Sequence, residues 1–201
     1  MKAAFIYSLI CCTIFGTTFT SMAQVEPFKL VSEPGDASCF YFNVQDAQGN
    51  RIKLPDHIQQ ALDCPYSVGL KGNFLTFVDD LKVKLYNLQD SSEQELFTLY
   101  NDIDGFSSPA WSDDGKEVLF VIVNQELKHN YKSMCRIIYL KLDEDGSILV
   151  KRKFDRPVNF SCGSICTAIP GEDFYFKGNR IVYKLHWIES DGEDDYREIK
   201  L

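Results

Sequence analysis

The stretch SSPAWSDDGKEVLFVIV, residues 107–123, decides the fold of this chain. Its first residues predict a short strand, and the run from Val118 to Val123 is apolar throughout, which is typical of a strand buried on both faces. Between them Asp114-Gly115 is a turn dipeptide, and glycine supplies the positive φ that a tight turn requires. The stretch therefore predicts two antiparallel strands joined by an acidic turn.

A glycine followed five residues later by a phenylalanine occurs at Gly115 and Phe120 and three more times along the chain. The other pairs are Gly35 with Phe40, Gly72 with Phe77, and Gly171 with Phe176. β-Rich runs separated by turn residues follow each pair, and repeated meanders of about 40 to 50 residues are typical of β-propellers. The sequence thus predicts an all-β fold, a small or partial propeller of about four antiparallel four-stranded blades. An antiparallel β-sandwich is the alternative.

Alternation and turn residues place the individual elements. Val83 and Leu85 alternate with Lys82 and Lys84, which indicates a half-buried strand with its lysines on the open side. Residues 56–63 predict a short helix with Asp56 as its N-cap. The end strands, 28–31 and 197–201, would pair if the arc closed into a ring. The other expected strands cover residues 40–44, 51–54, 74–78, 82–88, 95–100, 118–123, 135–142, 148–154, 174–176 and 181–188.

The N-terminus has the pattern of a signal peptide. Lys2 is followed by an apolar run, and Ser21-Met22-Ala23 offers small residues for cleavage before Gln24. We expect residues 1–23 to be removed and residues 24–201 to form a single propeller-like domain that is secreted or periplasmic. An uncleaved membrane anchor is the alternative. Lipidation at Cys11 is disfavoured because apolar sequence continues after it, and no later run is long enough to span a bilayer.

The charge and the cysteine content of the sequence limit the kinds of partner and ligand that we expect. The net charge of −8 argues against nucleic acid and anionic membranes, which need clustered basic residues. Acidic turns at residues 143–146 and 191–195 lack a calcium-loop pattern and indicate solvated turns. No cofactor or metal is expected, because Cys162 and Cys166 have no second ligand pair at suitable spacing. Five cysteines remain after processing, an odd number whose pairing the spacing does not fix: Cys39, Cys64, Cys135, Cys162 and Cys166.

The central stretch resembles the blade motif of TolB-type propellers, also called the WD40-like β-propeller repeat. The usual form is Pro-x-Trp-Ser-Pro-Asp-Gly-Lys-x-apolar-x-Phe, and this copy has Asp113 in place of the second proline. The other repeats match loosely. The resemblance implies a structural motif in an exported propeller that binds proteins or cell-envelope components. Its residues are Pro109, Trp111, Asp113, Asp114, Gly115 and Phe120.

Physical chemistry gives these motif residues structural roles. Trp111 would lie beside the neighbouring blade and bury a large area. Asp113 and Asp114 would accept hydrogen bonds from backbone amides of the turn. The motif by itself implies no catalysis.

Catalytic signals are weak in this sequence. No Gly-x-Ser-x-Gly frame is present, and His57, His129 and His186 lie far apart along the chain. We therefore expect a non-enzymatic binding module of the cell envelope. A structural scaffold or propeller remnant without a small ligand is the alternative, and a hydrolase or lyase acting at the propeller mouth is a further one.

The predicted recognition element is a loop at residues 124–133. It interrupts a chain whose other connections are short, and longer loops often carry binding residues. Its candidate residues are His129, Asn130 and Tyr131. The expected partner is a protein or an envelope component. An open arc would also leave sheet faces uncovered, which favours self-association.

Overall fold

The computed structural model describes residues 26–35, 40–65, 67–99, 105–129, 132–160, 173–187 and 196–201. Within these residues the protein is all-β, apart from the short helix α1 (Asp56–Ala61). The strands are β1 (Phe28–Pro34), β2 (Phe40–Asp46), β3 (Val68–Lys71), β4 (Phe74–Asp79), β5 (Lys82–Asn87), β6 (Glu93–Thr98), β7 (Gly105–Phe106), β8 (Ala110–Trp111), β9 (Glu117–His129), β10 (Lys132–Leu142), β11 (Ile148–Phe160), β12 (Phe174–Lys177), β13 (Arg180–Lys184), β14 (His186–Trp187) and β15 (Tyr196–Lys200).

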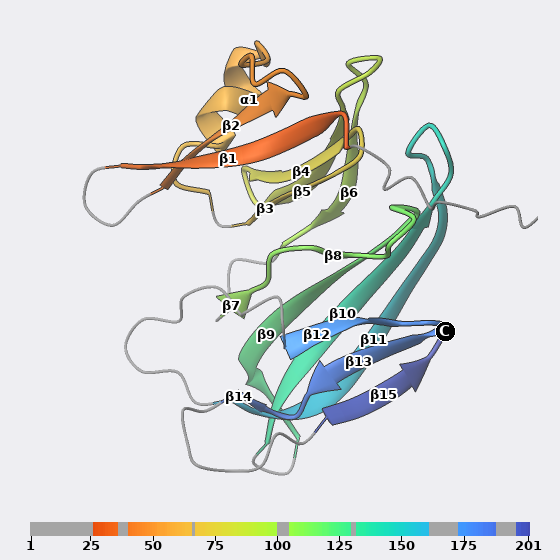
Figure 1. Cartoon of the computed structure of the whole chain (residues 1–201). Coiled ribbons are helices and arrows are strands. Elements are labelled where there is room, and N and C mark those ends of the chain that lie inside the picture. The colour runs from red at the N-terminus through yellow and green to blue at the C-terminus, as the bar shows by residue number, and fades with distance from the viewer. Residues whose placement is uncertain are drawn as a thin grey trace, which may run out of the picture.

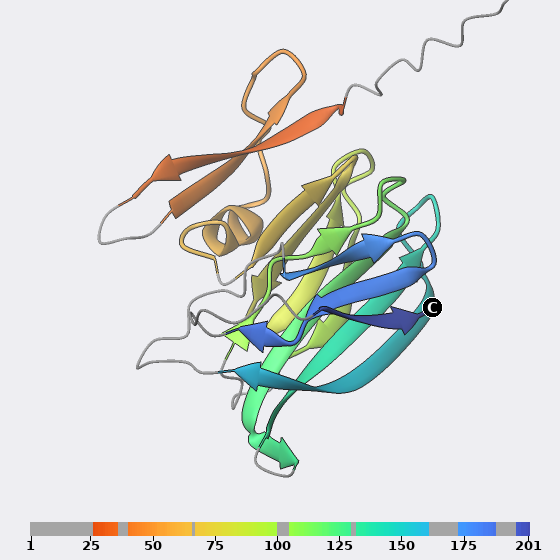
Figure 2. The ribbon, with the colours of Figure 1, turned by 60° about the horizontal axis from the view of Figure 1, so that its bottom comes forward.

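The strands form four sheets that follow one another in chain order (Figure 1). The first contains β1 and β2, and the second runs β3-β4-β5-β6. The third has the order β14-β11-β10-β9-β7, with β8 also paired to β9, and the fourth has the order β12-β13-β15. Neighbouring strands are antiparallel except for β11 and β14. In Figure 2 the first sheet, in orange, lies at the top, and the fourth, in blue, lies in front of the third.

Three apolar clusters hold the sheets face to face. One joins the first sheet and α1 to the second sheet, through residues such as Val44, Ile58 and Phe77. The next joins the second sheet to the third, where Phe97, Phe106 and Phe120 stack edge-on and face-on. The last joins the third sheet to the fourth, and includes Leu119, Ile137, Phe174, Ile181 and Ile199. Each inner sheet is thus covered on both faces.

Strand β9 shows why the central stretch is apolar throughout. Side chains alternate between the two faces of a strand. Val118, Phe120 and Ile122 therefore face the second sheet, whereas Leu119 and Val121 face the fourth. All five are at most 7% exposed, because no face of this strand meets solvent.

The arrangement is a partial β-propeller of four sheets, as the sequence predicted, and not a two-layered sandwich. The sheets contain two, four, six and three strands, so the expectation of four strands in each holds for the second sheet alone. Ring closure by the end strands is wrong for this chain. β1 pairs with β2 and β15 pairs with β13, and the two end sheets do not join within the described residues.

The glycine–phenylalanine repeat is confirmed in the two inner sheets. Gly72 and Gly115 have positive φ values of 57° and 70°, and Phe77 and Phe120 are buried. At the first sheet the pattern fails, because Phe40 is 55% exposed and Gly35 is not among the glycines with positive φ. Gly171 lies outside the described residues. The repeat therefore marks the sheets that have a neighbour on each side.

Two local expectations also need correction. The helix forms, but its N-cap is Pro55, without a side-chain cap, and Asp56 is its first residue. Residues 51–54 do not form a strand and contribute only an isolated bridge between Arg51 and Gln45.

The predicted signal peptide, residues 1–23, lies outside the described residues. In the part of the chain that the structure describes, no helix is both long and apolar enough to cross a membrane.

Candidate functional site

The acidic turn between β8 and β9 is built by hydrogen bonds of Ser112 and Asp114. The Ser112 hydroxyl lies 2.6 Å from Asp114 Oδ1, which also accepts a hydrogen bond from the Lys116 amide at 3.1 Å. The Glu117 amide donates to Ser112 Oγ. These bonds lower the pKa of Asp114, with the Ser112 hydroxyl as the main cause. The predicted turn role is confirmed for Asp114, whereas Asp113 is exposed and lines a cavity described below.

Trp111 and Pro109 of the motif pack against the second sheet. The Trp111 ring stacks on Phe74 at 6.5 Å between centroids, with 10° between the ring planes. A Cβ atom at Gly69 in β3 would collide with the Pro109 ring, so glycine at this position lets the two segments approach. The predicted placement of Trp111 beside a neighbouring blade is confirmed. The motif is therefore a structural element that joins the second and third sheets.

A cavity of about 290 Å³ lies between the β5–β6 turn and the β10–β11 turn. Gln94 Nε2 donates to the Gly146 carbonyl and ties the two turns together. The lining is mostly polar and includes carboxylate, amide and hydroxyl groups. It consists of Leu85, Asn87, Asp90, Ser92, Glu93, Gln94, Asp145 and Ser147. We take this cavity as the candidate binding site, because it places several hydrogen-bonding groups around one hollow.

The carboxylates of this cavity stay ionised over a wide pH range. A side-chain hydrogen bond with Asp143 and others from Ser147 lower the pKa of Asp145 to about 2. The Ser92 hydroxyl and amide hold the pKa of Asp90 below its usual range. Asp90 and Asp145 therefore bring two negative charges to the cavity lining at neutral pH, which favours a positively charged ligand group.

A smaller cavity of about 260 Å³ lies between the β3–β4 turn and the β8–β9 turn. Lys71 Nζ lies 2.8 Å from Glu26 Oε1 at its rim. Antiparallel strands bring alternate turns to the same end of a sheet, so this cavity shares an end of the molecule with the larger one. Its lining includes the motif residues Asp113, Asp114 and Gly115.

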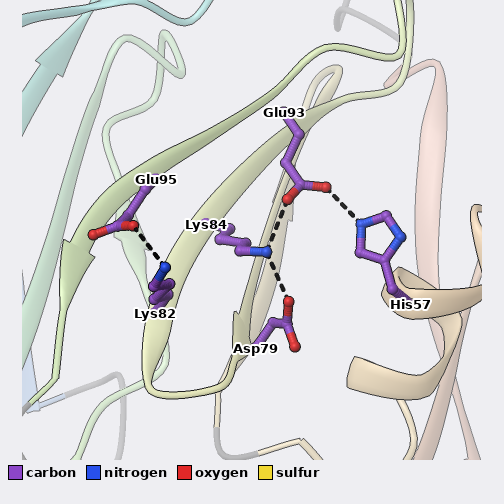
Figure 3. Close-up of polar contacts among 6 residues, drawn as sticks. All are labelled: His57, Asp79, Lys82, Lys84, Glu93 and Glu95. Carbon is purple, nitrogen blue, oxygen red and sulfur yellow. Dashed lines mark hydrogen bonds and ion pairs between the residues drawn. The ribbon is translucent and has the colours of Figure 1, made fainter.

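A chain of charged side chains joins α1 to the second sheet (Figure 3). Lys84 Nζ lies 2.7 Å from Asp79 Oδ2 and 2.9 Å from Glu93 Oε1. The other oxygen of Glu93, Oε2, lies 2.7 Å from His57 Nε2. The prediction of open lysines on β5 is therefore wrong for Lys84, whose side chain is 17% exposed because α1 covers it.

Both central groups of this network are held charged. Hydrogen bonds with Asp79 and Glu93 raise the pKa of Lys84. Burial opposes the charge of Glu93, but hydrogen bonds from His57 and Lys84 outweigh it and leave its pKa below the usual range. Neither group exchanges protons readily near neutral pH, which does not suit general acid–base catalysis. The network instead fixes α1 against the second sheet.

Of the predicted recognition residues, the structure describes the backbone of His129, which lies away from both cavities. Residues 124–129 continue β9 and residues 132–133 begin β10, so the expected loop is strand over most of its length. The polar residues that follow the apolar run predict a loop, but in the structure they continue the strand. His129 lies at the last position of β9, at the opposite end of the sheet from the β8–β9 and β10–β11 turns. Asn130 and Tyr131 lie outside the described residues.

Two of the five cysteines expected in the processed chain, Cys64 and Cys135, lie in the part of the chain that the structure describes. Cys135 is a free, buried thiol, and burial raises its pKa to about 12. Cys64 is disulfide-bonded, and Cys39, Cys162 and Cys166 lie outside the described residues. Among the described residues, no three or more His, Cys, Asp and Glu side chains gather closely enough to hold a metal ion.

No protein-family model matches this sequence, and no curated protein is similar to it at a significant level. Solved structures are similar in fold. An oligogalacturonate lyase in complex with manganese has a TM-score of 0.50 and 11% identity, over 87% of this chain and 47% of its own. An oligogalacturonate lyase from Vibrio parahaemolyticus has a TM-score of 0.44 and 10% identity, over 79% of this chain and 42% of its own. The chain thus spans about half the length of these proteins, and the likeness shows the fold alone.

Proposed function

We propose that the chain is an exported, non-enzymatic binding module of the cell envelope that engages a protein or envelope component. The observation that carries the proposal is the cavity of about 290 Å³ between the β5–β6 and β10–β11 turns. Its carboxylates, amides and hydroxyls suit a cationic, hydrogen-bonding group, such as a lysine or arginine side chain of a partner protein. The blade motif, which resembles TolB-type repeats, supports the same kind of role.

A binding experiment tests this proposal with isosteric variants. Asp90→Asn combined with Asp145→Asn removes both charges but keeps the oxygens that accept the turn amides. We expect the double variant to retain a partner from envelope extract about 10-fold less well than the unchanged protein. The control is Glu144→Gln, in the same turn but outside the cavity lining, with a side chain that is 90% exposed.

Three results would count against the proposal. Equal retention by all three proteins would exclude the cavity as the binding site. Turnover of oligogalacturonate in the presence of manganese, the compounds named for the similar structure, would show an enzyme instead. An exported protein whose N-terminus is not Gln24 would remove the proposed cleavage after Ala23.

A further inference from the structure

Exposed aromatic side chains are concentrated on the two end sheets. Among the described residues, the large apolar side chains that are exposed are Phe40, Tyr41, Leu149, Tyr175 and Tyr196. Four of these five belong to the first or the fourth sheet, and Leu149 alone belongs to an inner sheet. The end sheets are also the ones that have one face without a neighbouring sheet in this part of the chain.

The outer face of the fourth sheet has an aromatic centre. Phe174 and Ile181 face the third sheet, so the alternate residues face outward. Tyr175 lies opposite Val182 on the neighbouring strand, and Tyr196 lies opposite Lys184. The Tyr175 and Tyr196 rings meet edge to face at 6.4 Å and are 42% and 39% exposed, whereas Val182 between them is 3% exposed.

A row of positive charges runs beside this aromatic centre. Lys177 lies opposite Arg180, and Arg180 lies opposite Lys200, on three adjacent strands. Like charges on neighbouring strands disfavour the pairing, and among the described residues Glu198 offsets them, through ion pairs with Arg180 and Lys177. The face is therefore positive in a chain with a net charge of −8, and two copies of this face would repel each other.

The outer face of the first sheet is different. Strand alternation places Lys29, Val31 and Glu33 of β1 there, beside Tyr41 of β2 and beside Asn43, which is 2% exposed. Asn43 Nδ2 donates to Glu33 Oε1 at 2.8 Å. This face has balanced charge and an exposed tyrosine, so it can receive the positive face of the fourth sheet without repulsion.

We propose that the fourth sheet of one copy packs on the first sheet of a second copy, and the reverse, so that two chains close a ring. The contact repeats the face-to-face packing that already joins the sheets within the chain. A closed ring with twofold symmetry leaves neither end face exposed. The proposal is independent of the cavity and its partner.

Light scattering and analytical ultracentrifugation of the purified chain test this assembly. We expect the mass of a dimer, and we expect Tyr175→Asp with Tyr196→Asp to raise its dissociation constant by at least about 10-fold. Tyr41→Lys, on the opposite end sheet, should weaken the dimer as well, because it removes the ring and places a positive charge against the positive face. The control is Leu149→Asp, a 58% exposed apolar position on an inner sheet, which should leave the dimer unchanged.

Mixing the two variants distinguishes this geometry from others. The Tyr41→Lys copy retains an intact fourth sheet and the Tyr175→Asp, Tyr196→Asp copy retains an intact first sheet, so the mixture should recover a dimer through one interface. A monomeric parent protein would overturn the proposal. Loss of the dimer in the fourth-sheet variant alone would show pairing of identical faces, and longer open oligomers would show that the ring does not close. Circular dichroism verifies that each variant is folded.

Discussion

The inner and end sheets of this propeller are built from the same kind of hairpin, yet they differ in what covers them. Phe120 in the third sheet is completely buried between two neighbours, whereas Tyr175 in the fourth is 42% exposed. Turn glycines with positive φ precede the buried phenylalanines of the inner sheets, and the first sheet lacks this feature. The inner sheets therefore differ from the end sheets in having both faces covered, and not in the sequence of their strands alone.

The largest loss of stability is expected from removing a buried aromatic ring of an inner sheet. Phe120→Ala should lower the free energy of unfolding by about 3 to 5 kcal/mol, because it leaves a cavity between Phe97 and Phe106. Tyr175→Ala, on an end face, should cost less than about 1 kcal/mol at low chain concentration, where a dimer contributes least. Denaturant unfolding measures both, and equal losses would remove the distinction between inner and end sheets.

A smaller effect is expected at the buried hydroxyl of Ser107, which accepts a hydrogen bond within the third sheet. Ser107 Oγ accepts a hydrogen bond from the Val121 amide at 2.8 Å, and the Ser107 carbonyl accepts one from Ser67 Oγ at 2.9 Å. Ser107→Ala should lower the free energy of unfolding by about 1 to 3 kcal/mol, because the buried Val121 amide loses its acceptor. Ser108→Ala is the control at the next position. No difference between them in thermal unfolding would show that water replaces the hydroxyl.

The smallest effect is expected at the ion network between α1 and the second sheet. The pKa of Glu93 is lowered in the folded protein, so its contribution to stability is present at neutral pH and disappears as pH falls through the folded pKa. Glu93→Gln should lower the free energy of unfolding by about 1 kcal/mol at pH 7 and by less under acidic conditions.

Glu95→Gln provides the matched control on the same strand. Its partner Lys82 lies 3.6 Å away, and both side chains are largely exposed. This variant should change stability less than Glu93→Gln does. Equal effects of the two variants, or a Glu93→Gln effect that does not depend on pH, would mean that α1 is held by its apolar residues alone.

Local patterns were reliable where they depended on neighbours in the sequence. The Asp114-Gly115 turn, the apolar alternation around Phe120 and the short helix were all predictable from residue type and spacing. The cavity and the Lys84 network were not, because they join turns and side chains tens of residues apart, such as Gln94 with Gly146 and His57 with Glu93. The recognition loop was misplaced because a polar strand and a polar loop have similar composition.

By itself, the amino-acid sequence determined the all-β class and the stacking of hairpins, since turn chemistry and period-two alternation act over a few residues. The tertiary structure alone decided that the arc stays open within the described chain, which faces are covered, and where a polar cavity forms. These properties depend on packing between residues that are far apart in the sequence, which local turn and strand patterns do not specify.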